Sequence, residues 1–126
     1  MAVERILVVG NGGRENALAW ALARSPQQPQ VWISPGNGAS ASIPGCTVLN
    51  YAASDAAALA ECCQTLGIDL AVIGPEAPLA AGLADQLRSA GIAVFGPGAD
   101  GAQLEASKEW AKTLMQQAGV PTAGFW

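Results

Sequence analysis

Short apolar runs alternate with alanine- and leucine-rich stretches along the first 100 residues of the chain. The runs at 5–9, 30–33, 46–49, 69–73 and 92–95 have the length and β-branched character of buried strands. Stretches at 14–24, 54–66 and 78–90 repeat apolar residues at helical spacing, whereas the small polar segment 38–45 is expected to be a loop. Strands that alternate with helices are typical of a parallel sheet covered by helices, so the pattern predicts an α/β fold.

Each predicted helix has expected ends and an expected buried face. Ser54 is the expected N-cap of the second helix, and Gly67 the glycine that ends it. A helix that starts near Pro78 is expected to continue until Gly91. The residues expected on the buried faces are Ala17, Leu18, Ala21 and Leu22, then Leu59, Cys62, Cys63 and Leu66, then Leu79, Leu83 and Leu87.

The pattern changes after residue 98. Residues 99–106 predict a short helix, and Ser107 is the expected N-cap of another at 108–118, with Trp110, Leu114 and Met115 on its buried side. The last residues, up to Trp126, are expected to be extended with no strand beside them, which favours a fragment of a longer chain.

Composition narrows the class of protein. Of 126 residues, 51% are apolar and 13% charged, which predicts one globular domain. The net charge is −4 and the basic residues are scattered, so neither nucleic acid nor a membrane surface is an expected partner. The chain has no histidine, and its three cysteines lack the spacing of a zinc site. An odd number of cysteines without a secretory signal favours a cytoplasmic protein with reduced thiols.

Four predicted strands end in segments rich in glycine and proline. These are Gly-Asn-Gly-Gly at 10–13, Ser-Pro-Gly-Asn at 34–37, Gly-Pro-Glu at 74–76 and Gly-Pro at 96–97. In a parallel sheet all four lie at the carboxyl edge, where doubly wound folds bind their ligands. The sequence therefore predicts a binding site at this edge.

The segment at 10–13 favours an anion as the ligand. Its glycines leave backbone N–H groups bare before a helix, and Arg14 can add a bidentate contact to phosphate. The alternative is that the glycines only make a tight turn. A dinucleotide is disfavoured, because the third glycine of that fingerprint would fall at Glu15 and no acidic residue occurs between Glu15 and Asp55.

Glu76 is a second candidate, held in its loop between Pro75 and Pro78. Its carboxylate can accept hydrogen bonds from sugar hydroxyls, or it can be an acidic residue that stabilises a helix N-terminus. No set of residues suited to nucleophilic or general acid–base catalysis stands out, so no catalytic residue is assigned.

These segments resemble one family in order and spacing. Val-Val-Gly-Asn-Gly-Gly-Arg-Glu-Asn-Ala-Leu-Ala-Trp at 8–20 is similar to the opening of phosphoribosylamine–glycine ligases. Segments 34–37, 69–79, 95–97 with 102–108, and Pro-Thr-Ala at 121–123 agree as well, so the resemblance covers nearly the whole chain. One departure is Asn16, where the family usually has histidine. Asparagine does not titrate near neutral pH, so no acid–base role is expected there.

The resemblance implies a Rossmann-like, pre-ATP-grasp domain with helices on both faces of its sheet, at 1–100. Residues 101–126 would be a helical linker and the start of a truncated ATP-grasp domain, the missing part being the chain's partner. The full-length ligase would join glycine to phosphoribosylamine with ATP and Mg²⁺ to form glycinamide ribonucleotide in purine biosynthesis. The fragment itself is expected to be inactive and to hold no cofactor tightly. The implied substrate-binding residues are Asn11, Gly12, Gly13, Arg14, Glu15, Gly36, Asn37, Pro75 and Glu76, and Lys108 is the implied ATP contact.

Three other interpretations stay open. The chain can be the pre-ATP-grasp domain of another ligase or carboxylase, a nucleotide-binding module without catalysis, or an NAD-dependent oxidoreductase.

Overall fold

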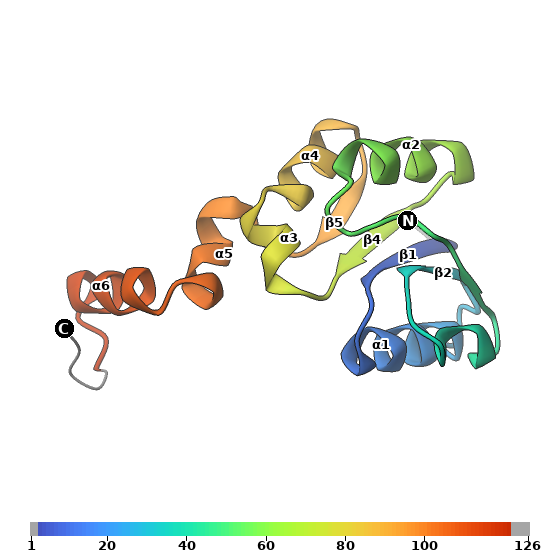
Figure 1. Ribbon diagram of the computed structural model, residues 1–126, viewed down its shortest axis with the longest axis horizontal. Helices are drawn as coiled ribbons and strands as arrows, with labels where there is room; N and C mark the ends of the chain where they lie inside the picture. Colours follow the sequence, from blue (N-terminus) through green and yellow to red (C-terminus); the bar gives the residue numbers. More distant parts are fainter. Residues whose placement is uncertain (1–2, 122–126) are drawn as a thin grey trace.

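The computed structural model describes residues 3–121 as five parallel strands with helices on both faces (Figure 1). The strands are β1 (Arg5–Gly10), β2 (Gln30–Pro35), β3 (Cys46–Val48), β4 (Leu70–Ile73) and β5 (Ala93–Phe95). Their order across the sheet is β3-β2-β1-β4-β5. The helices are α1 (Gly13–Ala23), α2 (Ala56–Leu66), α3 (Glu76–Ala80), α4 (Leu83–Ser89), α5 (Ala99–Ala106) and α6 (Lys108–Ala118), with a short 3-10 helix, η1, at Ser40–Ser42. The predicted α/β fold is confirmed.

β1 lies at the centre of the sheet and is buried on both faces. Ile6 and Val8 pack in the cluster that α1 covers, while Leu7 and Val9 pack in the cluster that α2, α3 and α4 cover. Both faces of a parallel sheet are buried in this way, which explains a continuous apolar run in place of alternation. The predicted face of α2 is confirmed, with Leu59 and Cys63 fully buried.

Two expected helical features are wrong in detail. On α1, Leu18 and Leu22 pack against the core as expected, but the fully buried residues are Glu15 and Ala19, and Ala17 and Ala21 are exposed. The expected single helix up to Gly91 is two short helices, because the chain turns at Gly82, whose φ of 94° favours glycine. The three leucines still point into the core.

One of the expected helix caps, the N-cap of α2, is wrong. The N-cap of α2 is Asp55, whose Oδ1 accepts a hydrogen bond from the N–H of Ala58 at 3.1 Å, and Ser54 lies one residue too early. Gly67 ends α2 in the left-handed conformation, as predicted. Ser107 caps α6 by accepting from the N–H of Trp110.

The last two helices leave the body of the fold. α5 packs on α3 and α6 packs on α5, so that α6 lies beyond the sheet (Figure 1). Ala111 is buried on α6 and Trp110 and Met115 are partly buried, whereas Leu114, which was expected on the buried side, is exposed. The expected extended segment up to Trp126 lies outside the described residues, apart from residues 120 and 121. In the described part of the chain, no helix is long and apolar enough to cross a membrane.

Candidate functional site

The ends of the three central strands meet at one edge of the sheet. The N–H of Gly36 donates to the carbonyl of Gly10 at 3.0 Å, and the N–H of Gly74 donates to the carbonyl of Val9 at 3.1 Å. These bonds hold the loops after β2 and β4 on either side of the loop after β1. Parallel pairing therefore brings the three predicted segments together at the carboxyl edge.

The first turn of α1 faces solvent at this edge without a side-chain cap. Gly12 is its N-cap residue and makes no side-chain hydrogen bond, which leaves the first backbone N–H groups for an external acceptor. Gly13 adds to this opening, because a Cβ placed on it would meet nothing within 4 Å. Neither glycine has the positive φ that would require glycine for the backbone. Open space and bare donors at a helix N-terminus form a site suited to an anion.

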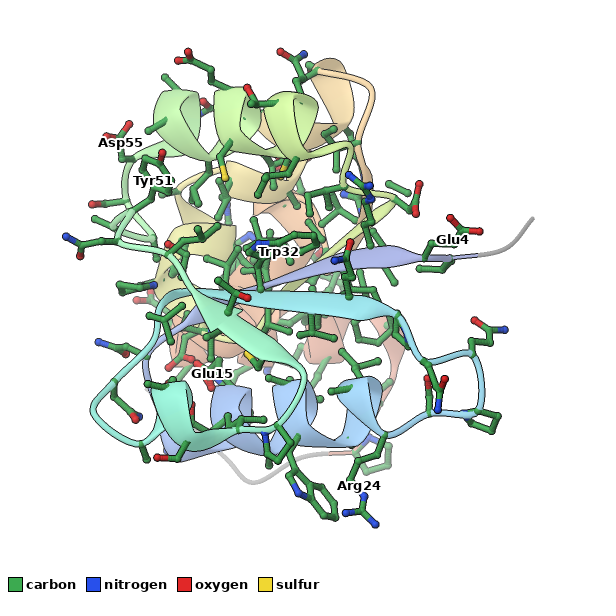
Figure 2. The ribbon with its side chains drawn as sticks, turned by 90° about the vertical axis from the view of Figure 1, so that its right-hand side faces the viewer. Glu4, Glu15, Arg24, Trp32, Tyr51 and Asp55 are labelled. Atoms are coloured by element: carbon green, nitrogen blue, oxygen red, sulfur yellow. The ribbon has the colours of Figure 1, made fainter. Side chains whose placement is uncertain are left out.

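Arg14 lies between two carboxylates from different helices, α1 and α3. Its Nε faces Glu15 Oε2 at 3.4 Å, and its Nη2 faces Glu76 Oε2 at 3.9 Å. Arg14 and Glu76 are more than half exposed, whereas the Glu15 side chain is 4% exposed. Glu15 therefore lies beneath the loop, on the side of α1 that faces the sheet (Figure 2).

Asn37 joins the loop after β2 to the start of α1. Its Nδ2 donates to the carbonyl of Asn11 at 2.9 Å, and its Oδ1 accepts from Asn16 Nδ2 at 2.9 Å. Ser40 closes the network, since its Oγ donates to Asn16 Oδ1 at 2.6 Å and accepts from the N–H of Asn37. Gly36 is required beside it, because its φ is 68° and a Cβ there would lie 2.9 Å from Ser40 Oγ. Asn16 thus takes part in a fixed hydrogen-bond network that involves no titratable group.

A cleft of about 500 Å³ opens beside these loops. Ser34 shapes one wall, since its buried Oγ donates to the carbonyl of Tyr51 and accepts from its N–H, which fixes the loop before α2. The cleft is lined by Gly10, Asn11, Pro35, Ala52, Ala53, Ser54, Ala56, Pro75, Ala77, Pro78, Ala81, Leu83 and Gln86. Its volume lies in the range of small-molecule sites, roughly 300–1,000 Å³.

The structure brings most of the predicted site residues together and leaves one apart. Asn11 and Pro75 line the cleft, and Glu76 lies between two of its lining residues. Lys108 opens α6, which Figure 1 shows beyond α5 and away from the sheet. Neither Ser40 nor the cleft wall formed by Ala52, Ala53, Ser54 and Ala56 was predictable, because small residues there carry no pattern that marks a binding wall.

Comparison with known proteins shows which family the chain is related to. The family profile described as "Phosphoribosylglycinamide synthetase, N domain" matches residues 4–105. The phosphoribosylamine–glycine ligase of Nostoc sp. is 52% identical over 119 residues, 94% of this chain and 28% of the relative. The trifunctional purine biosynthetic protein adenosine-3 of Homo sapiens is 49% identical over 94% of this chain and 12% of the relative.

Solved structures agree on the fold. Glycinamide-RNase-transformylase T from Mycobacterium tuberculosis matches with a TM-score of 0.65 and 24% identity, over 98% of this chain and 38% of that one. The biotin carboxylase subunit of pyruvate carboxylase matches with a TM-score of 0.69 and 17% identity, over 98% of this chain and 29% of that one. The chain thus spans 28% of the ligase it matches from Nostoc sp.. From its profile match and from relatives about half identical in sequence, the chain belongs to the phosphoribosylglycinamide synthetase N-domain family.

Proposed function

We propose that this chain is the substrate-binding domain of an ATP-dependent phosphoribosylamine–glycine ligase. In the whole enzyme, glycine would be joined to 5-phosphoribosylamine to give glycinamide ribonucleotide. Membership of the family and relatives named as this ligase support the proposal. The role of the described residues is to bind and orient the phosphoribosyl part of the substrate.

The observation that carries the proposal is the open first turn of α1. Gly13 has empty space where a side chain would be, and no side chain caps the helix. A phosphate placed there accepts from the bare N–H groups of Gly13 and Arg14 and gains from the helix dipole. Neither internal packing nor backbone strain accounts for glycine at position 13, whereas close approach of a ligand does.

Charge near the turn sets how the phosphate binds. Arg14 has two carboxylates beside it, so this group of three side chains carries a net charge of −1, from one positive and two negative groups. The contact between Arg14 and Glu76 is long and exposed, and such pairs contribute little. We infer that the phosphate replaces Glu76 as the partner of the outer guanidinium nitrogens. Glu76 is then released to accept hydrogen bonds from the ribose hydroxyls.

The cleft beside the turn fits the sugar. Asn11 and Pro75 stand at its border with the phosphate turn, and Ser54 and Gln86 supply polar groups on its far walls. Most of the remaining lining is alanine, proline and leucine, which excludes water from a bound ring. The substrate would therefore lie with its phosphate at α1 and its ribose over the ends of β1 and β4.

Within residues 3–121, no group of three or more His, Cys, Asp or Glu side chains is arranged to hold a metal ion. Lys108 lies on α6, apart from the cleft. We propose that 1–100 forms the substrate domain and that 101–126 leads into the part of the ligase that binds ATP and Mg²⁺ and activates the glycine carboxylate. No catalytic step is assigned to this chain.

A titration followed by NMR tests the proposal. Ribose 5-phosphate added to the ¹⁵N-labelled chain should shift the amides of residues 11–15 and those around Glu76, with ribose as the control that lacks phosphate. Arg14→Gln should weaken binding, while Arg24→Gln, which removes an exposed arginine that stacks on Trp20, should not. Shifts confined to other parts of the chain, or an equal response to ribose, would refute the site. NADH in the same assay distinguishes a dinucleotide module, which should respond to it.

A further inference from the structure

Glu15 is a buried carboxylate directly beneath the proposed phosphate turn. Its residue is 3% exposed, and it projects from the first turn of α1 toward the sheet (Figure 2). It contacts Gly10, the last residue of β1, and Gly74, the residue that follows β4. A Cβ on Gly10 would lie 2.4 Å from Glu15 Cγ, and a Cβ on Gly74 would lie 2.6 Å from it.

Glycine at position 74 is explained by this contact alone. Its φ is not in the left-handed region, so the backbone accepts any residue there. Added atoms at 2.6 Å are closer than packed atoms approach, so even alanine would displace the Glu15 side chain. Glu15 therefore packs over both glycines at the ends of β1 and β4, on the face of the sheet that α1 covers.

The same carboxylate holds Arg14. Adjacent residues on a helix point in different directions, so the Arg14 side chain must fold back over the loop for its Nε to lie 3.4 Å from Glu15 Oε2. This contact is partly buried, whereas the contact between Arg14 and Glu76 is exposed. Of the two carboxylates, Glu15 is thus the one that fixes where the guanidinium lies.

We propose that Glu15 is a positioning residue and not a substrate ligand. It packs over the glycines from which the loops after β1 and β4 start, and it orients Arg14 so that its outer nitrogens face the phosphate. The inference rests on the proposed function, because that function supplies the phosphate. It replaces the direct substrate contact that the family resemblance implies for Glu15 with an indirect role.

The negative charge of Glu15 should weaken phosphate binding, whereas its hold on Arg14 should strengthen it. The two effects have opposite signs, so substitutions of Glu15 can test the proposal. A carboxylate beside an anion site weakens phosphate binding if its charge is all that matters. Glu15→Met keeps the volume and removes both the charge and the acceptor, while Glu15→Gln keeps the volume and an acceptor oxygen but removes the charge. Both side chains fit the space over the two glycines, so both variants are expected to fold.

The two variants are compared by NMR titration with ribose 5-phosphate. Glu15→Met should bind about tenfold more weakly than the unchanged chain, which is the lower end of the loss expected for one hydrogen bond to a charged group. Glu15→Gln should bind within about threefold of it, because its amide oxygen still accepts from Arg14 Nε. Tighter binding by both variants would show that only charge matters, and unchanged binding by both would show that only packing matters. Either result overturns the proposal.

A second measurement needs no ligand. The Nε–Hε resonance of Arg14 should exchange slowly in the unchanged chain and in Glu15→Gln, and faster in Glu15→Met, with Arg24 as the reference. An Arg14 resonance that is the same in all three proteins would overturn the positioning role. If the unchanged chain fails to bind ribose 5-phosphate, the proposed function fails, and this resonance still decides whether Glu15 orients Arg14.

Discussion

Replacing Gly13 with alanine should leave the fold as stable or more stable while weakening phosphate binding. Gly13 is the first residue of α1, its φ is not in the left-handed region, and an added Cβ would meet nothing within 4 Å. The methyl group therefore has no steric cost in the free chain. Alanine is about 1 kcal/mol more favourable than glycine within a helix, and less so at its first residue. We expect Gly13→Ala to raise the free energy of unfolding by about 0–1 kcal/mol.

The same methyl group should weaken phosphate binding. It occupies the open space above the first turn of α1, where the proposed phosphate accepts hydrogen bonds from backbone N–H groups. Losing one such charge-assisted bond costs about 1.5–3 kcal/mol, which is roughly a tenfold to hundredfold loss of affinity. Urea denaturation gives the stability, and titration with ribose 5-phosphate followed by NMR gives the affinity.

Gly91→Ala is the matched control, with the opposite expected result. Gly91 has a φ of 86° and lies between α4 and β5, at the other end of the sheet from the site. Alanine is strained there, so stability should fall by about 1 kcal/mol while affinity stays unchanged. If Gly13→Ala binds ribose 5-phosphate as tightly as the unchanged chain, the phosphate does not lie on the first turn of α1, and the reasoning from open space is wrong.

Four further changes test the fold and the site. Asn37→Ala removes hydrogen bonds to Asn11 and Asn16, so urea denaturation should show that the free energy of unfolding falls by about 1–2 kcal/mol. Asn37→Asp keeps the acceptor oxygen, so its loss should be smaller. Asp55→Ala should lower stability by about 1 kcal/mol and Ser54→Ala should leave it unchanged, because Asp55 is the cap; equal effects would contradict this assignment. Leu59→Ala in the core should cost about 2–5 kcal/mol in the same assay. Burial, and to a smaller extent Cys62, raises the pKa of the Cys63 thiol from 9.0 to about 11. The unfolded chain therefore loses this proton first, and the free energy of unfolding should fall as pH rises from 9 to 11. Cys63→Ala should remove that part of the fall.

The strands and the site edge were predictable from local patterns, and the positions of single side chains were not. Each strand appears as an apolar run, and each glycine- or proline-rich segment follows a strand, so parallel pairing places the segments at one edge. The buried position of Glu15 depends on two glycines that are distant in sequence from each other. Periodicity therefore found Leu18 and Leu22 of α1, which pack against the core, but not Glu15, because a charged residue is not expected at a buried position.

Breaks and caps also depend on contacts that local patterns do not contain. A proline at 78 and leucines at helical spacing predicted one helix, but Gly82 turns the chain so that α3 and α4 each fit the same face of the sheet. Ser54 and Asp55 are both good caps by residue type. The structure uses Asp55, because Ser54 belongs to the loop that lines the cleft.

The central position of β1 has a consequence for the order of folding. Its residues pair on one side with β2, about 25 residues further along the chain. On the other side they pair with β4, where Ile6 lies opposite Leu70. Contacts over such a separation form slowly, because a long stretch of chain must first be ordered. During synthesis, the strand made first keeps one unpaired edge until residue 73 has left the ribosome. The proposed phosphate turn depends on both neighbours of β1, so it is among the last parts of the sheet to take its final form.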